Sequence, residues 1–264
     1  MTERQDNSVA AAMESLYPFL YADGVHNEQA VLAQVRASTI DKAEEILELR
    51  RMIARRDGAR IAQCAGEMAA RFAAGGRLFA FGNGGSATDA AQLATLFLHP
   101  SPLHPGPLDP GSLHPSPLHP GSPHPAPRHD GTARPLPALG LASDPSVVTA
   151  LCNDIGIEVV FARQLGALAQ RGDIAVGLST SGNSGNLLRA FDEASQRGML
   201  TVGLAGYEGG KMAELDSLDY LFVVRSDSVH RIQEAQTTIY QVLWELTASE
   251  LTVMGVSHVP RDTR

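Results

Sequence analysis

Five short runs of apolar residues without polar alternation lie between residues 78 and 224. Stretches with apolar residues at helical spacing separate them, at 86–98, 145–151, 155–170, 186–197 and 229–251. Apolar runs of this kind are typical of strands that are buried on both faces of a sheet. The pattern predicts a three-layer α/β/α sandwich with a five-stranded parallel sheet, whose strands lie at 78–81, 139–142, 174–178, 200–204 and 220–224.

Helical spacing also marks the N-terminal part of the chain. Apolar residues recur through 27–57, which fits one long helix or two helices with a break near 38–41, and the pattern resumes over 61–72. Gly75 and Gly76 then offer a left-handed stop. We expect an N-terminal extension at 1–26, a main domain over 27–252 that begins with helices, and a C-terminal tail at 253–264.

A low-complexity insert interrupts this domain at 98–133. It reads LHPSP LHPGP LDPGS LHPSP LHPGS PHPAP, and it holds six of the nine histidines and eleven of the sixteen prolines. Proline at this density fixes φ and removes backbone donors, which predicts a polyproline II or disordered linker. Weak metal binding by the histidines, as in a metallochaperone, is an alternative, although successive histidines on such a helix point in different directions.

Composition narrows the class of protein. The chain has 264 residues, a net charge of −8 and a pI near 5.6. This length suits one large domain with appendages, and the acidic balance without clustered Lys and Arg argues against direct nucleic-acid binding. Cys64 and Cys152 lack metal-type spacing. The start MTERQDNS does not resemble a secretory signal, and no apolar stretch suits a membrane span, so we expect a cytoplasmic protein without a membrane partner.

Two glycine- and hydroxyl-rich loops follow predicted strands and open predicted helices. They read Gly82-Asn83-Gly84-Gly85-Ser86 and Ser179-Thr180-Ser181-Gly182-Asn183-Ser184-Gly185-Asn186. Glycines let the backbone approach an anion, hydroxyls add neutral donors, and helix N-termini supply free N–H groups. Neither loop has the Walker A or dinucleotide-binding spacing. Two such loops at one edge of a parallel sheet favour phosphate binding over simple strand–helix turns.

The sequence resembles a known family in five stretches, which are GNGGSATDAAQLA, ASDPSVVTALCND, LSTSGNSGN, GYEGGKMAEL and HRIQEAQTTIYQVLWELT. Together they resemble the SIS (sugar isomerase) domain, and within it the phosphoheptose (sedoheptulose 7-phosphate) isomerase branch. The resemblance covers roughly 30–97 and 134–252 and implies the SIS fold, a homotetramer with sites between subunits, and a phosphorylated sugar as ligand.

The resemblance also implies which residues bind that ligand. The phosphate loop carries over to Ser179, Thr180, Ser181 and Ser184, whereas the sugar contacts carry over to Asn83, Ser86, Asp144 and Gln233, beside Gly84 and Gly85 of the first loop.

The positions that the family uses for proton transfer and zinc have changed. The family's catalytic His and Glu positions fall on Gln92, Thr95 and Leu96, and its general-acid His falls on Gln241. An Asp of the family falls on His230. Its zinc set would become Gln92, Leu96, Gln233 and Gln241, so no cofactor is expected with certainty and no metal ligands are assigned.

Two hypotheses about function therefore stay open. Both take the chain to be a phosphosugar-binding protein. In the first hypothesis it is a ketose–aldose isomerase with relocated acid and base groups. In the second it is a non-catalytic phosphosugar-sensing or assembly tetramer. Isomerisation needs a group that titrates near neutral pH within reach of the substrate. The catalytic residue is unknown from the sequence, and the candidates are Asp89, His230 and Glu234.

Overall fold

The computed structural model describes residues 28–99 and 135–255. The chain divides into two units, Met1–Glu45 and Ile46–Arg264, and the first is described only as residues 28–45 of helix α3. Helix α3 (Glu28–Ala73) is continuous. Of the two predictions for this segment, the single long helix is the one observed, and it continues through the polar stretch around Asp57. The domain boundaries inferred from the sequence stay predictions.

The second unit contains the predicted parallel sheet. Its strand order is β2-β1-β3-β4-β5, and every neighbouring pair is parallel. The predicted burial on both faces holds for the three inner strands and fails at both sheet edges. The edge strand β2 exposes 46% of Leu139, and the edge strand β5 has only half-buried residues at alternate positions. The strands are β1 (Leu78–Gly82), β2 (Ala138–Gly140), β3 (Ile174–Ser179), β4 (Leu200–Gly206) and β5 (Tyr220–Val224).

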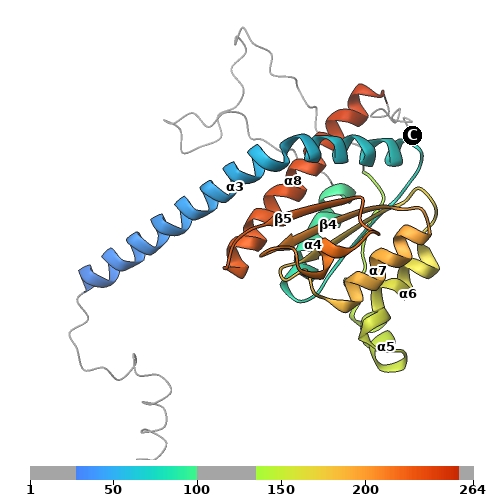
Figure 1. Ribbon diagram of the computed structural model, residues 1–264, viewed down its shortest axis with the longest axis horizontal. Helices are drawn as coiled ribbons and strands as arrows, with labels where there is room; N and C mark the ends of the chain where they lie inside the picture. Colours follow the sequence, from blue (N-terminus) through green and yellow to red (C-terminus); the bar gives the residue numbers. More distant parts are fainter. Residues whose placement is uncertain (1–27, 100–134, 256–264) are drawn as a thin grey trace, which may run out of the picture. The chain divides into compact units, whose positions relative to one another are not determined.

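Helices cover both faces of this sheet (Figure 1). One face packs against the second half of α3, α4 (Gly85–Leu98) and α8 (Val229–Val253). The other packs against α5 (Pro145–Asp154), α6 (Val160–Leu168) and α7 (Gly185–Gln196). The three-layer sandwich is thus confirmed, with one correction. The single helix expected over 155–170 is interrupted, because Gly156 has a φ of 93° and the 3₁₀ turn η1 (Ile157–Val159) precedes α6.

The sheet and the helices pack closely enough that side-chain size is restricted between them. A Cβ on Gly177 of β3 would lie 2.4 Å from Phe191 of α7 and 2.7 Å from Phe81 of β1. The two aromatic rings therefore fill the space above this glycine, with their centroids 5.2 Å apart. This packing fixes α7 over the carboxyl ends of β1 and β3, where the two loops singled out in the sequence lie.

The predicted insert falls almost entirely outside the described residues, as does most of the predicted tail. The flanks of the insert are nevertheless close together, since the Leu136 amide donates to the Phe97 carbonyl at 2.9 Å. Elsewhere, a short 3₁₀ segment, η2 (Gly210–Glu214), follows β4. In the two described ranges, no helix combines the length and apolarity needed to cross a membrane.

Candidate functional site

The carboxyl ends of three adjacent parallel strands bring three loops together. Gly82 of β1 is in register with Leu178 of β3, and Ser179 is in register with Ala205 of β4. The connections that follow these strands lie at 83–84, 180–184 and 207–209. This edge is where parallel α/β sheets bind ligands. Two of the three are the glycine- and hydroxyl-rich loops predicted from the sequence.

The loop after β3 is braced from both sides. The Gly182 amide donates to Ser179 Oγ at 3.0 Å, and the Gly182 carbonyl accepts from the Met212 amide at 2.9 Å. Asn183 Oδ1 accepts from the Lys211 amide at 3.0 Å. Gly182 has a φ of 67°, and a Cβ there would lie 1.9 Å from the Gly209 carbonyl oxygen. The loop therefore needs glycine at this position, and its shape is fixed before any ligand binds.

The helices that open from these two loops begin without side-chain caps. Gly84, which precedes α4, has no side chain that could cap the helix. Ser184 precedes α7, and its side chain makes no hydrogen bond to that helix. By contrast, Asp144 caps α5 and Ser228 caps α8. The Ser184 hydroxyl instead lies 3.4 Å from Ser179 Oγ. Amides of an uncapped first turn attract anions, so this arrangement suits a phosphate group.

The two loops are joined directly by a pair of asparagine side chains. Asn83 Nδ2 donates to Asn186 Oδ1 at 2.9 Å, and Asn186 Nδ2 donates to Asn83 Oδ1 at 2.9 Å. Asn83 belongs to the loop after β1, whereas Asn186 lies in the first turn of α7. The sequence resemblance implied a sugar contact for Asn83 and gave no sign of its bond to Asn186.

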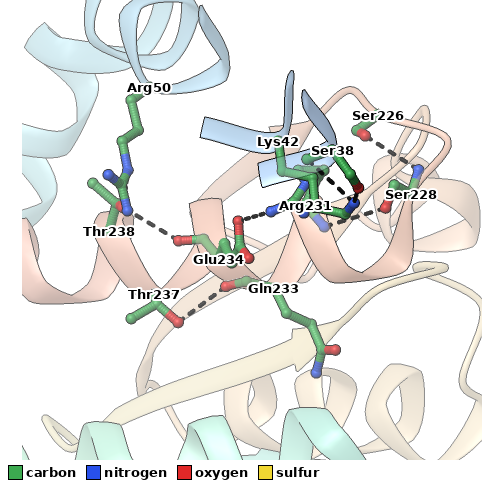
Figure 2. A network of polar contacts seen from close by, with 10 residues as sticks. All are labelled: Ser38, Lys42, Arg50, Ser226, Ser228, Arg231, Gln233, Glu234, Thr237 and Thr238. Atoms are coloured by element: carbon green, nitrogen blue, oxygen red, sulfur yellow. Dashed lines mark hydrogen bonds and ion pairs between the residues drawn. The ribbon is translucent and has the colours of Figure 1, made fainter. Parts of the chain in front are cut away.

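Gln233 of α8, a sugar contact implied by the sequence resemblance, lies beside the start of α4. Its Nε2 donates to Asp89 Oδ2 at 3.3 Å, and a Cβ on Gly85 would lie only 2.5 Å from that nitrogen. Burial raises the pKa of Asp89 above the ordinary carboxyl value, while the bond from Gln233 partly offsets this. Figure 2 shows Gln233 extending away from the side of α8 that carries Arg231 and Glu234. Gln233, Asp89 and Gly85 thus form one polar corner of the site.

The other candidates for proton transfer are placed less favourably. Glu234 pairs with Arg231 on the opposite side of α8 from Gln233 (Figure 2). His230 is exposed in the first turn of α8. Asp144, a predicted sugar contact, caps α5 by accepting from the Ser146 amide at 2.9 Å. Of these carboxylates and imidazoles, Asp89 is the one that the structure places beside Gln233.

Gln92, where the sequence resemblance implies a catalytic histidine, also takes part in a hydrogen bond. The buried Tyr240 hydroxyl donates to Gln92 Oε1 at 3.1 Å. Leu96, one turn further along α4, packs against the core. Neither residue offers a group that titrates near neutral pH.

Two further polar residues near these loops were not predicted from the sequence. Glu158 of η1 lies against the start of α7, because a Cβ on Gly185 would be 2.3 Å from its Oε2. Gln236 of α8 is fully buried, and its Nε2 donates to the Ser179 carbonyl at 3.3 Å. Its Oε1 has no partner among the described residues. No local signal identified them, since each meets the phosphate loop through the tertiary fold.

Comparison with known proteins places the chain in a family, although no family model matches it. A phosphoheptose isomerase from Nitratidesulfovibrio vulgaris is 36% identical over 212 residues, which span 80% of this chain and 88% of the relative. Another, from Aquifex aeolicus, is 35% identical over 70% of this chain and 82% of its own length. The chain belongs to the phosphoheptose isomerase family.

Solved structures of phosphoheptose isomerases share the fold. The enzyme from Neisseria gonorrhoeae superposes with a TM-score of 0.65 at 28% identity, over 81% of this chain and 99% of that one. The enzyme from Francisella tularensis gives 0.63 at 26% identity, over 83% and 98%. The SIS fold and the phosphoheptose isomerase branch, both predicted from the sequence, are confirmed.

The zinc set that the resemblance implies does not fit this member of the family. Leu96 has no donor atom, and Gln92 and Gln241 offer neutral amides instead of the imidazoles that bind zinc well. Within the ranges that the structure describes, no group of three or more His, Cys, Asp or Glu side chains could hold a metal ion. We therefore derive no catalytic step through zinc.

Proposed function

We propose that this protein binds a phosphorylated ketose of the kind that its phosphoheptose isomerase relatives are named for. The phosphate lies at Ser179–Ser184 and the uncapped start of α7, held by hydroxyls and backbone amides. The sugar lies toward the first loop, where Asn83, Ser86 and Gln233 offer donors and acceptors. The single observation that carries this proposal is the pair of uncapped helix N-termini at one sheet edge, whose loops are joined by Asn83 and Asn186.

Binding without efficient isomerisation is the function that the residues support best. Moving a proton between adjacent carbons requires a titrating group near those carbons. The residues at the family's acid and base positions, Gln92, Thr95, Leu96 and Gln241, supply none. A site that binds a phosphosugar without converting it suits a sensing or assembly role. The homotetramer that the resemblance implies would be the assembly that carries this site.

Slow isomerisation through Asp89 is the second candidate, and it rests on a specific observation. Asp89 lies beside Gln233, and burial raises its pKa toward the range in which a carboxylate serves as a base. The two candidates differ in turnover and share the binding site.

Two measurements on the purified protein test the proposal. Sedoheptulose 7-phosphate should raise the thermal unfolding midpoint, because a ligand that binds only the folded state stabilises it. The double variant Ser181→Ala with Ser184→Ala should lose that increase. Incubation with the same ketose, followed by assay of the aldose product, separates the two candidates. Turnover at the rate of an ordinary phosphoheptose isomerase would contradict the non-catalytic proposal, and no stabilisation by any phosphosugar would contradict the binding site.

A further inference from the structure

The Asn83–Asn186 pair is a reciprocal bond between two loops that are far apart in the sequence. Each side chain donates one hydrogen bond and accepts one, both nitrogen–oxygen distances are 2.9 Å, and the partners are 103 positions apart in the sequence. Such a ring needs a donor and an acceptor on both sides, and among side chains of this length an amide supplies both. The pair therefore depends on asparagine at both positions.

The two partners differ in burial. Asn186 is only 5% exposed at the start of α7, whereas Asn83 is exposed at the mouth of the first loop. The ring uses one N–H and one oxygen lone pair of Asn83, which leaves its second N–H and second lone pair for a ligand. Asn186 thus holds the Asn83 amide plane in one orientation while being covered itself.

The loops that the pair joins have separate tasks in the proposed function. The loop after β3 is already braced by Gly209, Lys211 and Met212, so the phosphate end of the site does not depend on Asn83. The first loop carries Gly84 with a φ of 55° and open space around it. Asn83 is the residue of this loop that is hydrogen-bonded to α7.

We propose that Asn186 is a positioning residue, which fixes the first loop against α7 so that one ligand can be held at its sugar end and its phosphate end together. This inference rests on the proposed function. It assigns the Asn186 side chain no contact with the ligand, because that side chain acts through Asn83. Loss of the pair should weaken the binding of a whole sugar phosphate and spare the binding of phosphate alone.

The test compares two ligands, sedoheptulose 7-phosphate and inorganic phosphate, in Asn186→Leu and in the wild-type protein. We expect the dissociation constant of the sugar phosphate to rise about tenfold, which corresponds to about 1.4 kcal/mol, and that of inorganic phosphate to change less than about twofold. Gln196→Leu, an amide-to-leucine change at the exposed far end of α7, is the matched control. If Asn186→Leu does not fold, Asn186→Ser takes its place in the test. The serine keeps a polar side chain in the first turn of α7 and is too short to reach Asn83.

A double-mutant cycle separates the pair from two independent contacts. Asn83→Ala removes both the ligand contact and the bond to Asn186, so adding Asn186→Leu should weaken sugar-phosphate binding no further. Additive losses would overturn the inference, as would an equal loss for both ligands, which would indicate a damaged phosphate loop. If the wild-type protein binds inorganic phosphate and no sugar phosphate, the proposed function fails as well, and that failure appears before any variant is made.

Discussion

The Tyr240 hydroxyl donates a hydrogen bond to Gln92 Oε1 at 3.1 Å, across the interface between α8 and α4. The sequence resemblance implies a histidine of the catalytic and zinc sets at the position of Gln92. In this protein the same position holds a neutral amide whose oxygen is engaged by a buried tyrosine. Burial also raises the pKa of Tyr240, so its hydroxyl stays a donor at neutral pH.

Restoring the family's residues should therefore restore proton transfer. We expect the triple variant Gln92→His, Leu96→Glu and Gln241→His to isomerise sedoheptulose 7-phosphate at least about 100-fold faster than the wild-type protein, since a positioned acid or base contributes about that much. The measurement is aldose formation, with and without zinc. Gln92→His alone is the control, because it disturbs the Tyr240 bond without supplying the carboxylate. A triple variant that still binds the ketose and gains no turnover would contradict the assignment of these positions.

The raised pKa of Asp89 predicts how stability depends on pH. Between the ordinary carboxyl value of 3.8 and the higher value in the folded protein, the folded state binds the proton more tightly. The contribution of the Asp89 carboxyl to the free energy of unfolding therefore falls as the pH rises through that window, and it is constant above the window. Asp89→Asn removes the buried charge and keeps an acceptor for Gln233. We expect its unfolding midpoint to exceed that of the wild type at pH 7.

The difference in midpoint should vanish below about pH 3, where the carboxyl is protonated in both states. Asp227→Asn, in the exposed loop before α8, controls for the change in net charge. A variant that is less stable than the wild type at pH 7 would show that the Asp89 charge stabilises the fold instead.

Two glycines with positive φ allow the stability cost of backbone strain to be compared with the cost of strain plus a steric clash. Gly84 and Gly182 have φ values of 55° and 67°, but only at Gly182 does a neighbouring backbone atom occupy the space that a Cβ would need. Gly84→Ala should cost about 1–3 kcal/mol, because a φ of 55° with a ψ of −125° is sparsely populated by residues that carry a Cβ. Gly182→Ala should cost about 3 kcal/mol or more, because it also collides with the Gly209 carbonyl. Urea unfolding measures both, and equal costs would mean that the 207–209 loop moves aside freely.

Glu158 places a negative charge beside the proposed phosphate. Its carboxylate lies at Gly185, where the helix dipole of α7 attracts it and where it repels a bound phosphate. We expect Glu158→Gln to bind sugar phosphate and inorganic phosphate about threefold more tightly, with a smaller gain at high salt, since exposed charges are screened. Glu250→Gln near the end of α8 makes the same change in net charge away from the site. If both variants bind equally, Glu158 does not act on the ligand.

The sheet and both loops could be predicted because their signals are local. Apolar runs mark β1, β3 and β4, and the glycines and hydroxyls of each loop follow a strand directly. The pairs that decide what the site can do are not local. Asn83–Asn186 and Tyr240–Gln92 join residues 103 and 148 positions apart, so they exist only once the helices are packed. The break at Gly156 was missed for a different reason, because apolar spacing continues on both sides of it.

The flanks of the insert predict the outcome of removing it. The Leu136 amide lies 2.9 Å from the Phe97 carbonyl, so the chain leaves α4 and returns to the start of β2 at nearly the same point. Deleting residues 100–127 leaves enough chain to close this gap and shortens the connection roughly fourfold. Because each doubling of a flexible loop costs about 0.6 kcal/mol, the deletion should stabilise the protein by about 1.2 kcal/mol. Thermal unfolding and size-exclusion chromatography check the prediction. A lower midpoint, a changed oligomeric state or lost ketose binding would show instead that the proline-rich segment contributes contacts of its own.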